Sequence, residues 1–179
     1  MDERRILKTE LRWAALMGGA VALILIVIVA TTLANALHPP SNVETVDPAT
    51  LHLEGEFVEA NLGTTQGADG TITVRLVATQ YAFVPRCLPV PAGRPVTFRV
   101  TSPDVLHGFL IAGTNANTMV VPGYVAELTT EFQETGDHLM PCHEYCGLGH
   151  SEMWAVVRVL PEADFNPDAN GRMACDVVP

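Results

Sequence analysis

The sequence predicts an all-β domain, a sandwich of short strands, preceded by a single membrane-spanning helix. Two observations give this class. The 25 residues of 13–37 contain no charged side chain, and about 20 apolar residues are enough to cross the hydrocarbon core of a bilayer as a helix. From residue 71 onward, apolar and polar residues alternate in short runs separated by glycine and proline, which is the pattern of half-buried strands.

The N-terminal part is expected to comprise a cytoplasmic segment, 1–12, and the transmembrane helix, 13–37. A signal peptide cleaved near residues 34–36 is the alternative, but its apolar core of about 7–15 residues is shorter than this run. Lys and Arg stay on the cytoplasmic side of a membrane helix. Four of them precede the helix and none follows it before Arg75. We therefore expect a single-pass protein of the cell (inner) membrane with a cytoplasmic N-terminus. Residues 38–179 would lie on the periplasmic or extracellular side, where disulfides persist.

Residues 38–70 are expected to form a linker, because HPPSNVETVDP is proline-rich and polar and NLGTTQGADG is glycine-rich. The β-domain is expected over 71–160. Its clearest alternating runs are TITVRLVA, PVTFRV, AELTTEF and WAVVRVL, which we interpret as antiparallel strands with one buried face. Strand spacing of about 8–12 residues favours a sandwich or a barrel. A C-terminal tail, 161–179, completes the chain.

The part of the chain after the helix is acidic. It contains 17 Asp and Glu against six Arg and no Lys, a balance of −11. Nucleic-acid binding needs a basic patch, so we expect no nucleic-acid partner. The charge is either an ordinary solvated surface or an acidic face that steers a basic protein partner.

The segment PCHEYCGLGHSEM, residues 141–153, carries four soft ligands within twelve positions: Cys142, Cys146, His150 and Met153. Proline and two glycines argue against a regular helix here. A structural disulfide, or two ordinary buried thiols, would leave the histidine and the methionine without a role. Thiolate, imidazole and thioether together suit copper, whereas zinc does not normally use methionine. Two thiolates can also bridge two metal ions, and His107 in TSPDVLHGF offers a second imidazole at the end of another strand.

SPDVLHGF, GTNAN and PCHEYCGLGHSEM follow one another within residues 71–160. In this order they resemble subunit II of the haem–copper oxygen reductases, the cytochrome c oxidase family, at its binuclear CuA site. The pattern C-x-E-x-C-x-x-x-H-x-x-M is highly specific. The single preceding helix and the HGF…GTN sequence resemble those of the compact B-family oxidases, whereas Glu144 between the cysteines matches the mitochondrial type.

The resemblance implies a cupredoxin-like Greek-key β-sandwich and a binuclear copper centre. Cys142 and Cys146 would bridge both copper ions. His107 and His150 would each bind one ion. The Met153 thioether and the Glu144 backbone carbonyl would be weak ligands. In oxidases that share Glu144, its side chain points toward subunit I at a magnesium-containing interface, so the resemblance also suggests magnesium there.

The implied function is that of the electron-accepting subunit of a terminal respiratory oxidase. Electrons would come from cytochrome c or a small copper protein and pass to haem in subunit I, where oxygen is reduced. The chain has no C-x-x-C-H haem motif. Tyr81 and Phe83 occupy the place where related subunits carry an aromatic cluster, so we expect them either to take part in electron uptake or to pack in the core.

Three other classes are considered. A CuA-containing nitric oxide reductase would use the same subunit with a different catalytic partner. A membrane-anchored Sco-type copper chaperone has a thioredoxin fold with βαβ units after its cysteines, and only 33 residues follow Cys146 here. An anchored blue copper carrier would need only one cysteine.

Cys87 and Cys175 lie outside the motif. In RCLPV, Leu88 and Val90 alternate with Cys87, so Cys87 is expected to point outward if the Leu–Val face is buried. The polar tail is not expected to hold itself against the sandwich by apolar burial alone. Two thiols in an oxidising compartment suggest a disulfide. The alternatives are two free cysteines, or a lipid or partner attached to one of them.

Overall fold

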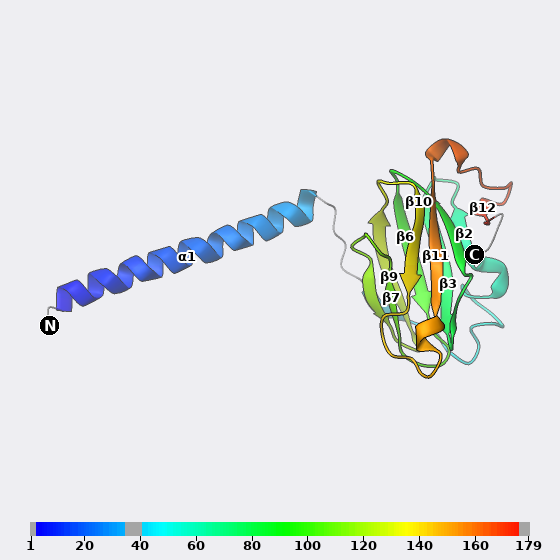
Figure 1. Cartoon of the computed structure of the whole chain (residues 1–179), viewed down its shortest axis with the longest axis horizontal. Coiled ribbons are helices and arrows are strands. Elements are labelled where there is room, and N and C mark those ends of the chain that lie inside the picture. The colour runs from blue at the N-terminus through cyan, green and yellow to red at the C-terminus, as the bar shows by residue number, and fades with distance from the viewer. Residues whose placement is uncertain (1–2, 35–40, 176–179) are drawn as a thin grey trace. The chain divides into compact units, whose positions relative to one another are not determined.

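The structure, a computed structural model, describes residues 3–34 and 41–175 and divides into two units, Met1–Leu37 and His38–Pro179. The first unit is one helix, α1 (Glu3–Ala34), and the second is the β-domain (Figure 1). The 32 residues of α1 measure about 48 Å at 1.5 Å per residue, longer than a hydrocarbon core of roughly 30 Å. No side chain of the helix is buried within the protein, as expected where lipid is the solvent.

The helix begins before the predicted residue 13. Residues 3–12 are mostly Glu, Arg, Lys and Leu, which favour helix almost as strongly as alanine, so the charged N-terminal segment continues the same helix. The predicted end at residue 37 lies outside the described residues.

The β-domain contains three sheets in the described part of the chain. The largest runs in the order β1 (Ser41–Thr45), β9 (Tyr124–Glu131), β6 (Pro95–Thr101), β3 (Ile72–Thr79), β2 (Gly63–Gln66) and β12 (Arg172–Met173), with β4 (Ala82–Val84) also paired to β3. The second is β10 (Gly136–Pro141), β11 (Trp154–Leu160) and β5 (Cys87–Pro91). The third pairs β7 (His107–Leu110) with β8 (Asn117–Val120), and the short 3₁₀ helices are η1 (Glu59–Asn61), η2 (His150–Glu152) and η3 (Glu162–Asp164).

The core lies between the sheets, where the apolar positions of the alternating runs meet. Buried and partly exposed residues alternate along the whole of β3, as a period of two requires. Phe98 of β6 is fully buried, and its ring centroid lies 5.6 Å from that of Phe109 and 6.3 Å from that of Phe132. The predicted all-β sandwich, which follows one apolar helix in the sequence, is therefore confirmed.

The prediction that all of these strands pair antiparallel is wrong. β3 runs parallel to β6, and β5 runs parallel to β11. A parallel pair needs a crossover connection, and the chain supplies one when it leaves β3, crosses to the second sheet as β5 and returns as β6. Alternation along a strand shows which face is buried, but it carries no information about the direction of the neighbouring strand.

Residues 38–70, expected to be a linker, are in large part attached to the domain. β1 pairs with β9 and β2 pairs with β3. Between these strands, Leu51 and Phe57 are buried in a small cluster with Val125. Glu56 forms ion pairs with Arg75 of β3 and Arg99 of β6. The high proline and glycine content predicted a linker. That prediction failed because a few apolar and charged residues are enough to attach the segment to the domain.

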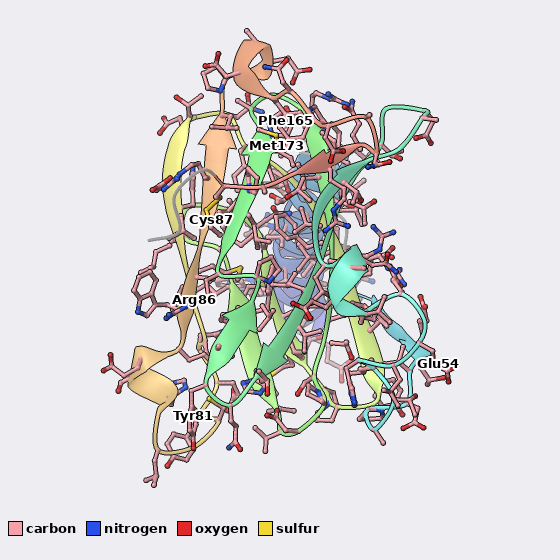
Figure 2. The ribbon with its side chains drawn as sticks, turned by 90° about the vertical axis from the view of Figure 1, so that its right-hand side faces the viewer. Glu54, Tyr81, Arg86, Cys87, Phe165 and Met173 are labelled. Carbon is pink, nitrogen blue, oxygen red and sulfur yellow. A yellow bond between two sulfur atoms is a disulfide. The ribbon has the colours of Figure 1, made fainter. Side chains whose placement is uncertain are left out.

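The tail is held by more than its disulfide. β12 pairs with β2, and Phe165 is buried in the main core with Met173 packed against it (Figure 2). The structure joins Cys87 to Cys175 through a disulfide, but Cys87 is buried, with only 5% of its surface exposed. Leu88 and Val90 belong to the main core and Cys87 does not, as the alternation predicts, but Cys87 is covered rather than exposed because all five residues of β5 are buried.

Candidate metal centre

Two neighbouring segments of the sandwich bring the predicted ligands together. His107 is the first residue of β7. The cysteine loop, residues 142–153, connects β10 to β11, whose ends pair antiparallel through Pro141 and Trp154. The amide of Cys142 donates to the carbonyl of Met153 at 2.9 Å and closes the base of the loop. The hairpin therefore fixes both ends of the loop on a rigid pair of strands.

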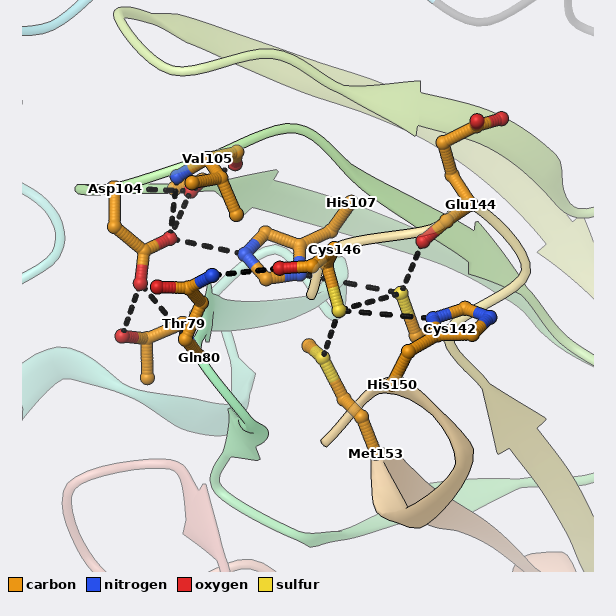
Figure 3. A network of polar contacts seen from close by, with 11 residues as sticks. Thr79, Gln80, Asp104, Val105, His107, Cys142, Glu144, Cys146, His150 and Met153 are labelled. Atoms are coloured by element: carbon orange, nitrogen blue, oxygen red, sulfur yellow. Dashed lines mark hydrogen bonds and ion pairs between the residues drawn. The ribbon is translucent and has the colours of Figure 1, made fainter. Parts of the chain in front are cut away.

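The sulfur and nitrogen atoms of five side chains converge in the interior (Figure 3). The Cys142 and Cys146 sulfurs lie 3.8 Å apart, too far for a disulfide, and both thiols are free. The remaining contacts are His107 Nδ1 to Cys142 Sγ at 3.9 Å, His150 Nδ1 to Cys146 Sγ at 3.6 Å, and Met153 Sδ to Cys146 Sγ at 3.7 Å. Two ligand atoms that share a tetrahedral metal at about 2.0–2.3 Å stand roughly 3.3–3.8 Å apart. Three of these separations fall in that range, and the one between His107 and Cys142 exceeds it by only 0.1 Å.

The centre is shielded from water on most sides. His107 is fully buried, and Met153, Cys146 and Cys142 expose 1%, 5% and 6% of their surfaces. The potential ligand atoms of His107 and of both cysteines lie within 4.8 Å of one another. His150 is only partly buried, so the site reaches the surface through one of its two imidazoles.

Asp104 orients His107. Its Oδ1 lies 2.9 Å from His107 Nε2. Burial raises the pKa of Asp104, but hydrogen bonds from His107, from the amides of Gln80 and Val105 and from the Thr79 hydroxyl outweigh burial and hold this pKa well below its usual range. An ionised carboxylate only accepts hydrogen bonds, so Nε2 carries the proton. The Nδ1 lone pair is then free to face Cys142, as in metal sites where a carboxylate fixes the histidine tautomer.

The metal-free thiol of Cys146 resists ionisation. Burial raises the pKa of the Cys146 thiol to about 11, and the neighbouring Cys142 adds to this effect. A metal that binds here must therefore displace protons, which couples metal loading to proton release. The donor set, two sulfur anions, two imidazoles and a thioether, fits copper.

Two glycines let the loop lie close to its neighbours. A methyl group at Gly108 would come within 2.6 Å of the Glu144 backbone nitrogen, and one at Gly149 within 2.6 Å of the Tyr81 ring. Such distances are well inside normal contact, so larger residues would push the loop away. The close approach at Gly108 also keeps His107, the preceding residue, against the cysteines.

The other predicted residues take different positions. The carbonyl oxygen of Glu144 lies 3.2 Å from Cys142 Sγ, whereas its carboxylate points away from the sulfur atoms (Figure 3). Tyr81 exposes 37% of its surface, and its hydroxyl accepts a hydrogen bond from the Leu148 amide at 3.1 Å. Phe83 is completely buried in the core. This burial agrees with the core-packing interpretation of Phe83, whereas its expected part in electron uptake stays a prediction.

Sequence reasoning missed Asp104 and Gln80 as parts of the site. Asp104 lies three residues before His107, and a carboxylate so close to a metal-binding histidine is a usable signal. Gln80, which donates to the Cys146 carbonyl at 2.6 Å, lies 66 residues from its partner in sequence, and no local pattern identifies it.

Comparison with known proteins assigns the family. The family model described as the periplasmic domain of cytochrome c oxidase subunit II matches residues 71–160, half of the chain. The chain belongs to the cytochrome c oxidase subunit II family. A cytochrome c oxidase subunit 2 of Thermus thermophilus is 35% identical over 159 residues, which cover 87% of this chain and 94% of that protein. A second Thermus thermophilus subunit 2 is 36% identical over 68% of this chain and 90% of its own length.

A solved structure agrees with this assignment. A chain in the cryo-EM structure of a heme–copper terminal oxidase dimer is 28% identical, with a TM-score of 0.57, and the match covers 82% of this chain and 99% of that chain. This subunit II is therefore part of an oxidoreductase complex and associates with other oxidase subunits. Its described residues after α1 form strands and short 3₁₀ helices, which excludes the βαβ units of a Sco-type chaperone's thioredoxin fold. The relatives' names do not favour the nitric oxide reductase alternative.

Proposed function

We propose that this subunit II holds a binuclear copper centre and passes electrons through it to subunit I. Cys142 and Cys146 would bridge the two ions, and His107 and His150 would each bind one. Met153 and the backbone carbonyl of Glu144 would be the weak ligands. The observation that carries the proposal is the arrangement of the two imidazoles, because the Nδ1 atom of His107 faces Cys142 and that of His150 faces Cys146.

The bound copper pair supplies one-electron redox chemistry. The protein supplies a rigid, dry frame for it. Burial of Met153 and both cysteines excludes water, and the hairpin under the loop resists movement of the ligands. A frame that holds the ligands in one geometry limits rearrangement on reduction, which favours fast transfer at a small driving force.

Electron uptake is proposed at the exposed tip of the cysteine loop. Leu148 exposes 95% of its surface, and its backbone amide donates to the hydroxyl of Tyr81, which exposes 37%. Apolar side chains exposed together mark an interaction surface. The electron donor would be cytochrome c or a small copper protein, and the acidic surface of the domain would steer a basic donor toward this tip.

Electron exit is proposed on the side of His150. Its ring is partly exposed, in contrast to the buried His107, so it is the ligand that a partner subunit can approach. We propose that haem in subunit I receives the electron from this side. The outward-pointing carboxylate of Glu144 would meet the same partner, where it is placed to bind magnesium at the interface.

The helix α1 is proposed to cross the cell membrane once. Its four basic residues near the N-terminus support a cytoplasmic position for that end, and the copper domain would then lie on the periplasmic or extracellular side. Copper analysis of the purified chain tests the proposal. We expect two copper ions per chain in the wild type and a loss of this pair in Cys146→Ser. One copper ion per chain in the fully loaded wild type would refute it.

A further inference from the structure

Gln80 touches both halves of the proposed ligand set. It follows β3 directly, and its backbone amide donates to Asp104 Oδ2 at 2.7 Å. The other oxygen of Asp104 contacts His107 Nε2. The side-chain amide of Gln80 donates to the carbonyl of Cys146 at 2.6 Å. Figure 3 shows this continuous chain of contacts from His107 through Asp104 and Gln80 to Cys146.

The residues on either side of Gln80 make the same kind of connection. The Thr79 hydroxyl donates to Asp104 Oδ2 at 2.9 Å. The Tyr81 hydroxyl accepts from the Leu148 amide, and its ring fills the space beside Gly149. Residues 79–81 therefore hold the His107 turn on one side and the cysteine loop on the other.

We propose that Gln80 is a positioning residue of the metal centre, which fixes the cysteine loop relative to His107. This inference rests on the proposed binuclear site. His107 is paired with Cys142, while His150 and Met153 are paired with Cys146. A link from the His107 turn to the Cys146 backbone therefore sets the geometry of one metal position relative to the other. Loss of the link would remove no ligand but would allow the loop, and the ligands that it carries, to shift relative to His107.

The effect of removing the link is expected to be modest. Gln80 as a whole is exposed, so water competes for the Cys146 carbonyl. A single net hydrogen bond then changes an equilibrium by only about two- to fivefold. A spectroscopic signature of the metal pair is more sensitive to a shift of the loop than is the amount of bound copper.

Two variants and one control separate positioning from general stability. Gln80→Ala keeps the backbone hydrogen bond to Asp104 and removes only the side-chain link. Gln80→Glu keeps the length, but a carboxylate cannot donate to the Cys146 carbonyl. Gln133→Ala is the control, because Gln133 donates to the exposed Glu131, which is no part of the ligand set.

The experiment uses the full-length chain in detergent, loaded with copper. We expect altered copper hyperfine splittings in the EPR spectrum and two- to fivefold faster copper release to a chelator for both Gln80 variants, with the larger effect in Gln80→Glu. The control should match the wild type, and the unfolding midpoints of all copper-free proteins should agree.

Spectra and release rates identical to those of the control would overturn the inference. So would a fall in copper-free stability with unchanged spectra, since that outcome marks a purely structural role. A wild-type chain without a binuclear spectrum would refute the proposed function itself. The wild-type spectrum is therefore measured before the variants are compared with it.

Discussion

Removal of the disulfide between Cys87 and Cys175 should lower the stability of the β-domain by a large and calculable amount. The bond closes a loop with a sequence separation of 88 residues. The chain-entropy model values such a loop at roughly 4–5 kcal/mol. For the unit His38–Pro179, an unfolding entropy of about 2.1 cal/mol/K per residue converts this free energy to an upper limit of about 15 °C in the melting temperature.

The expected drop is smaller than this limit but still large. Structure in the denatured state reduces the entropic term, and Phe165 and β12 still attach the tail without the bond. We expect the variant Cys87→Ala/Cys175→Ala to melt about 7–15 °C below the wild type.

Thermal unfolding of the copper-free, full-length protein, followed by circular dichroism, measures the difference. A reductant should lower the melting temperature of the wild type to that of the variant and leave the variant unchanged. A difference of less than about 2 °C, or an equal response of both proteins to the reductant, would refute the reasoning.

Three further predictions concern the ligands, the uptake surface and an ion-pair cluster. Cys142→Ser should lose the metal pair, whereas Met153→Leu should keep copper and raise the reduction potential, because only a weak bond is lost; equal copper loss in metal analysis would contradict this ranking. Tyr81→Ala should slow reduction by the electron donor in stopped-flow experiments while the copper spectrum stays normal, and an unchanged rate would exclude Tyr81 from uptake. The wild-type rate should also fall with added salt if the acidic surface steers the donor. Burial raises the pKa of Glu56, but Arg99 and Arg75 outweigh burial and hold it below its ordinary value. A lowered pKa stabilises the fold above the unfolded-state pKa and loses this effect as the pH falls through the folded value. Glu56→Gln should therefore be destabilising in urea titrations at pH 7 and lose most of its effect in acid, and a pH-independent difference would count against the ion pairs.

The sequence predicted the parts of this protein that local patterns determine. The charge-free run gave the helix, period-two alternation gave the main strands, and the spacing of Cys142, Cys146, His150 and Met153 gave the candidate ligands. Strand direction was not predictable, because β3 and β6 are parallel only through a crossover by way of the other sheet.

Contacts between distant residues were also beyond local patterns. The attachment of residues 38–70 depends on a few anchoring residues such as Phe57 and Glu56. The average composition of the segment does not identify such single residues. The burial of Cys87 depends on what packs over β5, and the link from Gln80 to Cys146 depends on the approach of two turns in space. These features belong to tertiary structure, and only the folded chain reveals them.

The EPR spectrum of the copper-loaded, full-length chain tests the central claim most directly. The claim is that Cys142 and Cys146 jointly hold two copper ions that share one unpaired electron. We expect a purple protein with a seven-line hyperfine pattern, since the electron is delocalised over two equivalent nuclei. A blue protein with a four-line pattern would mean a single copper ion and would contradict the account.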